Sequence, residues 1–194
     1  MNKKEKKRNL IDLVLIFFSF SFAGWLWELI YDLLNTGNLA NHGVLLGPWL
    51  PIYGFGSVFI YIFLDRYKKY PAVVFMGAFV LCTIVEYLTG WYLETYLNHR
   101  WWTYYDMPFN IDGRICLLSS IFFGIAGLAG IYVGIPKLKK FFSRFEYKKI
   151  LIACLLLTSI FIVDFVYSTF HPNIVKKHKI IDTEKLGEIK LFKK

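Results

Sequence analysis

The chain has 194 residues, is 56% hydrophobic and 20% aromatic, and carries a net charge of +9. An ordinary soluble domain has about 25% charged residues, whereas this chain has 19%, and they are confined to short segments between long apolar ones. This pattern indicates an integral membrane protein and excludes an ordinary soluble domain. Because the basic residues adjoin apolar segments, we expect the lipid bilayer as their partner and no nucleic acid.

Five apolar windows approach the roughly 20 residues that a helix needs to cross the hydrocarbon core. They predict an all-α fold, a polytopic membrane bundle of about five transmembrane helices within residues 10–170. A basic stub at 1–9 precedes this domain and a polar, basic tail at 171–194 follows it. The windows are residues 10–30, 47–64, 71–93, 115–135 and 150–170.

The first window follows the basic stretch KKEKKR. Its apolar run is longer than that of a cleaved signal peptide, and no small-x-small cleavage site follows, so we expect it to remain as a span. The second window is the weakest, because GPWLPIYGFG at residues 47–56 brings two prolines and three glycines into it. Prolines and glycines at this density predict a broken or kinked helix.

The connections predict the orientation of the chain. Fourteen Lys and Arg residues lie in the stub, in the 65–70 connection and in the 136–149 connection, against two, Arg100 and Arg114, on the other side. By the positive-inside rule the amino terminus faces the cytoplasm of a bacterial cell. Five spans would then place the tail, with its seven basic residues, outside. The alternative is that one of the five windows does not cross the membrane.

Three acids fall in or near the apolar windows. Glu28 lies near the outer interface, whereas Glu86 and Asp164 lie about 20 Å or more along their helices, well inside the hydrocarbon. An ionised acid at that depth is costly, so each needs a partner, a proton or a polar cavity. Arg114 is the expected partner for either deep acid, in a structural ion pair or in a substrate or proton site.

Two stretches share one plan. Glu28 is followed by Asn41–Gly43, and Glu86 is followed by NIDG at residues 110–113, and each motif is expected to open the next helix. The spacing from Gly43 to Gly54 equals that from Gly113 to Gly124. We therefore predict two parallel helix-pair repeats, residues 10–64 and 71–135, with a fifth helix at 150–170.

The polar residues of the two stretches form the predicted substrate-binding site between the halves, toward the outer leaflet. These residues are Glu28, Asn41, His42, Glu86, Asn110 and Arg114. The alternative for His42 is a surface turn. Trp101, Trp102, Tyr104 and Tyr105 predict an interfacial aromatic belt, with an outer lid as the alternative.

Other polar and thiol groups are expected to have no site role. Glu94, Asp106 and Asp112 are expected to be solvated loop acids. Cys82, Cys116 and Cys154 lie in apolar runs without CxxC spacing, so we expect buried thiols, no metal and no cofactor.

At these residues the chain resembles a family of small bacterial membrane proteins described as putative ABC-transporter type IV. The resemblance covers about residues 20–130. It rests on GWLWE at 24–28, GPWLPIYGFG at 47–56, EY at 86–87, and WWTYYDMPFNIDGRICL at 101–117 with the FFG that follows. The family has an Asp after the Trp pair, where this chain has Thr103.

The resemblance implies a permease or permease subunit that moves a small solute. The chain has no G-x-x-x-x-G-K-[ST] loop, so ATP dependence would need a separate ATPase subunit, docked on residues 136–149, where headgroup contact is the alternative. A homo-oligomer is the other possible partner. The competing interpretations are a structural or regulatory membrane protein and, less favoured, an enzyme acting on lipid or peptide with Glu86 and His42 as acid and base. Because no HExxH or GxSxG motif is present, we expect no catalytic residues.

Overall fold

The computed structural model describes residues 3–37 and 43–173 of the chain. Two predicted site residues, Asn41 and His42, lie outside the described residues. The tail from residue 174 onward also lies outside the described residues, so the prediction that it faces the outer side of the membrane stays a prediction.

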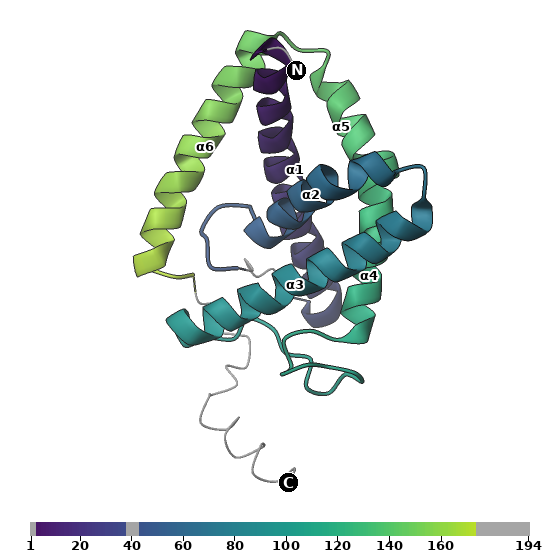
Figure 1. The fold of residues 1–194 in the computed structure, drawn as a ribbon. Coiled ribbons are helices and arrows are strands. Elements are labelled where there is room, and N and C mark those ends of the chain that lie inside the picture. Colours follow the sequence, from purple (N-terminus) through teal and green to yellow (C-terminus); the bar gives the residue numbers. More distant parts are fainter. Residues whose placement is uncertain (1–2, 38–42, 174–194) are drawn as a thin grey trace.

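The described chain consists of helices and connecting loops (Figure 1). Because α4, η2 and α5 follow one another without a break, they form one continuous rod, and the chain has five rods in its described part. This arrangement confirms the predicted all-α fold of about five helices. The elements are α1 (Lys3–Thr36), α2 (Pro51–Leu64), the 3₁₀ turn η1 (Asp65–Tyr67), α3 (Pro71–Leu97), α4 (Leu117–Ala129), the π-helical η2 (Gly130–Gly134), α5 (Ile135–Phe142) and α6 (Tyr147–Phe170).

Four of the rods are long and apolar enough to cross a membrane: Arg8–Leu34, Pro71–Leu97, Leu117–Phe142 and Tyr147–Phe170. The protein is therefore a multi-pass membrane protein. The exception is α2, whose 14 residues reach only about 21 Å of a roughly 30 Å hydrocarbon core. Four helices of spanning length and one short helix thus correspond to the five predicted windows, and the short helix is the one predicted to be broken.

The short second helix results from the predicted break. Residues 43–50, here called the re-entrant segment, are not helical, and α2 begins at Pro51. The Leu50 N–H donates to the Ser21 carbonyl at 3.0 Å, and Ser21 lies in the middle of α1. Pro51 occupies the first turn of α2, where its missing N–H costs nothing. The segment therefore runs back against the middle of α1 before the helix starts.

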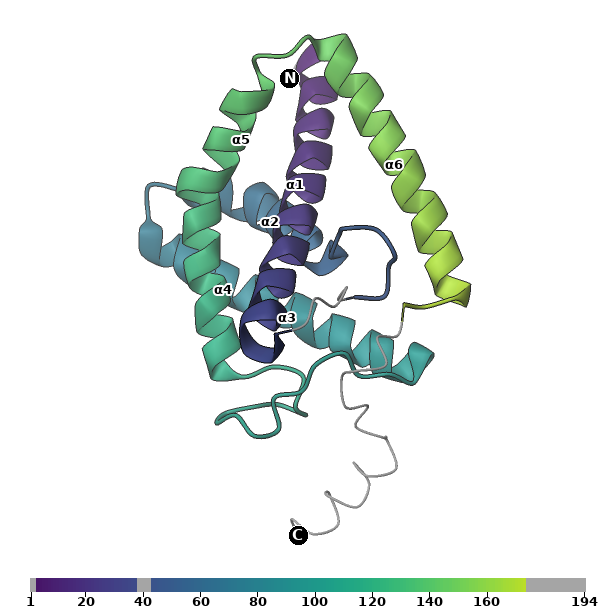
Figure 2. The same ribbon diagram turned by 180° about the vertical axis from the view of Figure 1, so that it is seen from behind.

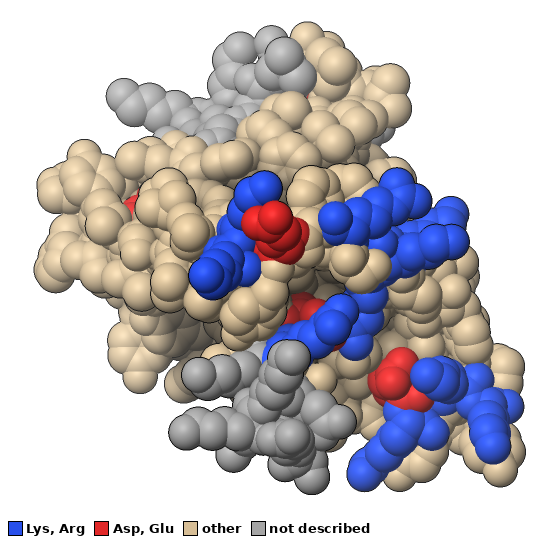
Figure 3. Space-filling model, turned by 90° about the horizontal axis from the view of Figure 1, so that it is seen from above, with Lys and Arg blue, Asp and Glu red and all other residues tan. Residues whose placement is uncertain are grey.

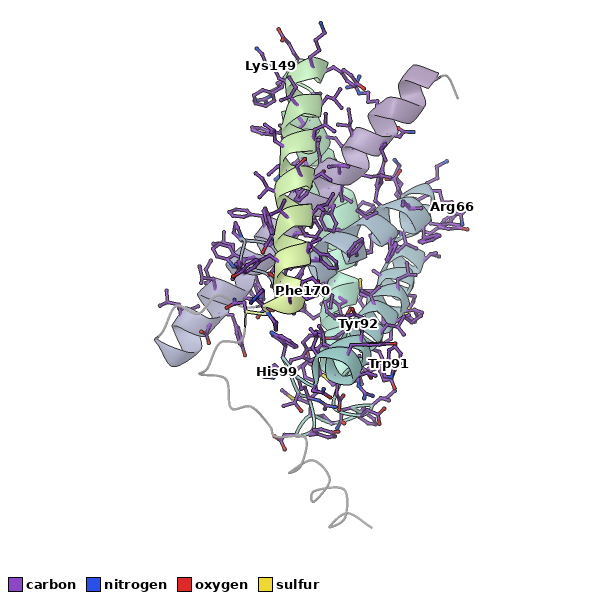
Figure 4. All side chains as sticks on the ribbon, turned by 90° about the vertical axis from the view of Figure 1, so that its left-hand side faces the viewer. Arg66, Trp91, Tyr92, His99, Lys149 and Phe170 are labelled. Carbon is purple, nitrogen blue, oxygen red and sulfur yellow. The ribbon has the colours of Figure 1, made fainter. Side chains whose placement is uncertain are left out.

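The rods are arranged around α1, with the α4–α5 rod on one side of it and α6 on the other (Figures 1 and 2). The α5–α6 connection lies beside the start of α1, at what we call the amino-terminal end. The opposite end, the loop end, carries residues 98–116. Figure 4 shows Lys149 at the amino-terminal end and Trp91, Tyr92 and His99 at the loop end, with apolar side chains projecting outward between them.

The core consists of aliphatic side chains where α1, α2, α3 and the η2–α5 segment meet. Ile16 and Val74 are fully buried in it. A smaller cluster of Ile11, Leu15 and Cys154 packs the start of α6 against α1.

Glycines allow the helices of each predicted pair to cross closely. Gly54 of α2 lies against Phe17 and Ser21 of α1, and Gly124 of α4 lies against Phe75 of α3. Phe17 and Phe75 are 58 residues apart, as are Glu28 and Glu86. The two repeats stay a prediction, and these matching positions agree with it.

We predict that Gly54→Ala and Gly124→Ala each destabilise the protein by about 1–3 kcal/mol, because the added methyl group would overlap side chains across the crossing. Gly54→Ala should cost more, because it also meets the Phe17 carbonyl, which is held by the helix backbone. Gly130→Ala is the matched control, since a methyl group there meets nothing within 4 Å. Thermal unfolding in detergent measures all three, and a control as damaging as Gly54→Ala would contradict the prediction.

The amino-terminal end is basic. Figure 3, seen from this end, shows Lys and Arg side chains gathered over it with few acids among them. Lys148 and Lys149 come from the start of α6, whereas Arg66, in the turn before α3, lies part-way toward the loop end (Figure 4). Lys139 of α5 is more enclosed: it pairs with Asp12 of α1 at 3.0 Å and donates to the Tyr61 hydroxyl at 2.6 Å. This contact ties α5 to α1 and α2.

Candidate functional site

Glu86 is the most enclosed acid of the predicted site, with only 4% of its surface exposed. It lies in α3 and accepts two hydrogen bonds. The Tyr104 hydroxyl donates to Oε1 at 2.9 Å, and the Ser119 hydroxyl lies 3.1 Å from Oε2. The deep acid therefore meets hydroxyl groups rather than a cation.

The loop and the start of α4 position these two hydroxyls. Ser119 is in the first turn of α4, where its hydroxyl and the Cys116 thiol cap each other's backbone N–H groups. The Tyr104 N–H donates to the Gly113 carbonyl at 2.8 Å, which attaches Tyr104 to a tight turn. Local capping chemistry thus holds both donors against Glu86.

The turn itself differs from the prediction for NIDG. Asp112 and Gly113 both have positive φ, 52° and 64°, and the Arg114 N–H donates to the Ile111 carbonyl. Two such residues in succession form a type I′ turn, and an isolated bridge joins Ile111 to Ile115. NIDG therefore forms a small hairpin before the helix, and α4 begins at Leu117 rather than at this motif.

Tyr104 keeps its proton. Burial raises the pKa of its hydroxyl above the ordinary value of a tyrosine, and the neighbouring Glu86 raises it further. The phenol is therefore a hydrogen-bond donor to Glu86 at every physiological pH.

The second acid, Glu28 of α1, also has a tyrosine partner. The Tyr53 hydroxyl of α2 donates to Glu28 Oε1 at 2.6 Å. Tyr53 also interacts electrostatically with Tyr104 and Glu86, which relates the two tyrosine–acid pairs. We call Glu28, Tyr53, Glu86, Tyr104 and Ser119 the acid–tyrosine site. Each predicted helix pair contributes one acid to it.

Arg114 lies elsewhere than expected. It pairs with Glu94 at 2.8 Å and with Asp112 at 2.8 Å, and Arg100 shares Glu94 at 2.6 Å. The expected pairing of Arg114 with Glu86 or Asp164 was wrong, and so was the expectation that Glu94 is solvated. Burial lowers the pKa of Arg114, but the bonds and charge of Glu94 outweigh it and the net shift is upward. This charge cluster holds the loop on α3.

Asn110 also stabilises the loop. Its side-chain amide donates to the carbonyls of Tyr105 and Met107, and its Oδ1 accepts from the Gly113 N–H at 3.1 Å. Since these bonds engage both ends of the amide, the structure places Asn110 in the hairpin rather than beside Glu86.

Asp164, the other deep acid, binds the re-entrant segment. Its carboxylate accepts from the backbone N–H groups of Leu46 at 3.1 Å and Gly47 at 2.9 Å and from the Trp49 indole at 2.7 Å. Ser168, one turn along α6, donates at 3.0 Å. The acid therefore supplies acceptors to backbone donors that no helix satisfies.

The aromatic run of the loop points inward at several positions. The Trp102 indole donates to the Arg114 carbonyl at 2.9 Å, Tyr104 contacts Glu86, and Tyr105 stacks on Arg100. These side chains support the hairpin and the site. Exposed aromatic residues at the loop end, including Trp27, Trp91, Tyr92 and Tyr96, are those that can form an interfacial belt.

Sequence reasoning missed Tyr53, Tyr104 and Ser119 as members of the site. Ser119 had a readable signal, because it lies three residues after Cys116 at the start of an apolar window, the spacing of a capping pair. Tyr53 also had a signal, because its hydroxyl is the one polar side-chain group in the stretch PIYGFG at residues 51–56. Nothing local marks Tyr104 among the other aromatic residues of the loop.

The thiols are as predicted: Cys82, Cys116 and Cys154 are free and buried. Across the described residues, no group of three or more His, Cys, Asp or Glu side chains is arranged to hold a metal ion.

Comparison with known proteins identifies a family. A family model described as "Putative ABC-transporter type IV" matches residues 15–169 of the chain. No curated protein and no solved structure matches it. The matched range begins within α1 and ends within α6, and it includes the re-entrant segment, the hairpin and both acids.

Proposed function

The chain belongs to the putative ABC-transporter type IV family, and on this premise we propose that it is a permease, or a permease subunit, that moves a small solute across the membrane. The observation that carries the proposal is the acid–tyrosine site, in which Glu28 and Glu86 come from different predicted helix pairs and each accepts a hydrogen bond from a tyrosine hydroxyl. Buried ionisable groups of this kind mark ion and substrate pathways in membrane proteins.

The broken second pass supports the same proposal. Transporters build their binding sites beside discontinuous helices, whose free backbone groups face the transported species. Here the re-entrant segment leads into α2, and Tyr53, in the first turn of α2, bonds Glu28. A movement of this segment would therefore move Tyr53 within the site.

We propose that the basic amino-terminal end faces the cytoplasm and the loop end faces outward, as the positive-inside rule directs. A separate ATPase subunit would then dock on residues 136–149, where Lys148 and Lys149, at the start of α6, are exposed. Co-purification of an ATPase with the tagged full-length chain tests this partner, and its absence from a complex that transports would exclude the ATP-driven form.

We predict that Glu86→Gln lowers transport by about tenfold or more while the fold survives, because glutamine keeps the shape and hydrogen bonds but cannot gain or lose a proton. The measurement is uptake into proteoliposomes of a panel of labelled sugars, amino acids and small organic ions, with thermal unfolding alongside. Asp65→Asn is the matched control, since Asp65 lies in the turn before α3 and pairs with the exposed Lys68.

The second candidate is a structural or regulatory membrane protein. It is favoured by the hydroxyl groups that bond both acids, because such contacts also serve to join helices. In that case Glu86→Gln would lower stability and leave the uptake of the remaining folded protein unchanged. The bonded groups are hydroxyls rather than bases, so the site suits binding better than acid–base catalysis.

A further inference from the structure

Glu86 forms no salt bridge with the residues that the structure describes. The two arginines of the loop, Arg100 and Arg114, are held by Glu94, two turns further along α3. A buried acid without a cation is poorly stabilised as a carboxylate, because neutral donors replace only part of the lost hydration.

The other groups that face Glu86 are neutral or acidic. Tyr104 and Ser119 bond it from the loop and from α4, and Cys82 lies one turn before it in α3. Tyr53 of α2 interacts electrostatically with Glu86, and its hydroxyl donates to Glu28 of α1.

Proton counting at Ser119 points the same way. Its hydroxyl has one hydrogen but two possible acceptors, Glu86 Oε2 at 3.1 Å and the Cys116 carbonyl at 2.9 Å. The Cys116 N–H also approaches the Ser119 oxygen, at 3.3 Å. If the Ser119 hydroxyl donates its hydrogen to the Cys116 carbonyl, a hydrogen bond between Ser119 and Glu86 requires a protonated Glu86 carboxyl group as the donor. A neutral Glu86 therefore satisfies every contact in this group.

We propose that Glu86 is a proton-binding site, at which a neutral carboxylic acid inside the bundle releases and regains a proton beside Tyr104. The inference deepens the proposed function, on which its meaning for transport rests, by naming the proton as the ion bound at the acid–tyrosine site. Tyr104 belongs to the loop, so the carboxyl group lies next to the loop end rather than the basic end.

The test treats the purified full-length protein in detergent with dicyclohexylcarbodiimide, an apolar reagent that adds to protonated carboxyl groups. Peptide mass spectrometry then locates the adducts. Glu94 is the internal control, because it lies in the same helix but is held as a carboxylate by two arginines. We expect Glu86 to be labelled about tenfold more than Glu94, with labelling that falls as the pH rises.

Infrared spectroscopy provides a second measurement that does not depend on access of the reagent. A protonated carboxyl group has a C=O band that a carboxylate lacks, and Glu86→Gln should remove that band. Persistence of the full band in Glu86→Gln, together with an unlabelled Glu86, would overturn the proposal. Glu28→Gln should leave both signals at Glu86 in place.

The outcome separates this inference from the proposed function. Lost uptake in Glu86→Gln without labelling or an infrared band in the unmodified protein would keep the transport role and exclude the proton. Labelling and the band with unchanged uptake would keep the proton site and exclude its role in transport.

Discussion

Asp164→Ala is expected to lower the free energy of unfolding by about 3–5 kcal/mol, one of the two largest effects that the structure predicts. The Asp164 carboxylate accepts hydrogen bonds from two backbone N–H groups and from the Trp49 indole. The two N–H groups belong to a non-helical segment, so no helical carbonyl accepts from them. Within a membrane, water cannot replace the lost acceptor. Asp164→Asn should fall between alanine and the unmodified protein, because an amide retains one acceptor oxygen.

Thermal unfolding in detergent gives the stability, and a disulfide cross-link reports the local structure. The Asn173 N–H donates to the Val44 carbonyl at 2.9 Å, so cysteines at 44 and 173 should cross-link readily. The Asp164→Ala change should slow that cross-link, because the re-entrant segment loses its attachment to α6. Thr169→Ala is the control: its hydroxyl is exposed and bonds only the Phe165 carbonyl of its own helix. Equal stability of the two variants would refute the role assigned to Asp164.

Glu94→Gln is expected to cost about 2–3 kcal/mol and to loosen the loop. One oxygen of Glu94 accepts from Arg100 and twice from Arg114. The side chains of Arg100 and Arg114 are only 7% and 15% exposed, so neutralising Glu94 removes the negative charge that these two enclosed cations share. The effect stays below that of a fully buried pair, because Glu94 retains 21% exposure.

Limited trypsin digestion measures the loosening directly, since trypsin cleaves after Arg100 and Arg114 once the loop opens. Asp112→Asn is the matched control. Asp112 also pairs with Arg114, but it is 48% exposed, so its loss should cost only about 0.5 kcal/mol. If the two variants were digested at the same rate, Glu94 would not be the residue that holds the loop.

Much of the architecture was predictable from local sequence. Apolar windows of the right length predicted the helices, and Pro48 and Pro51 predicted the break before α2. The buried state of Cys82, Cys116 and Cys154 also followed from their apolar neighbours. Each of these properties depends on residues within a few helical turns of one another along the chain, so it can be predicted from a single sequence.

The partners of the charged groups were not predictable in the same way. Arg114 was expected to pair with one of the deep acids, Glu86 or Asp164, yet the type I′ turn at Asp112 aims it at Glu94. Arg114 was also the expected partner of Asp164, yet Asp164 binds backbone N–H groups. A backbone donor has no sequence signature, since it becomes free only where the chain leaves a helix.

The sequence alone thus determined which segments are apolar helices, where one of them breaks, which family the chain resembles and that its deep acids need partners. Only the tertiary structure decided what those partners are: hydroxyls for Glu86, an N–H cluster for Asp164 and two arginines for Glu94. The physical reason is range. Helix formation and hydrophobicity are local, whereas hydrogen bonding in a membrane pairs whichever groups packing brings within about 3 Å of each other, however far apart they lie along the chain.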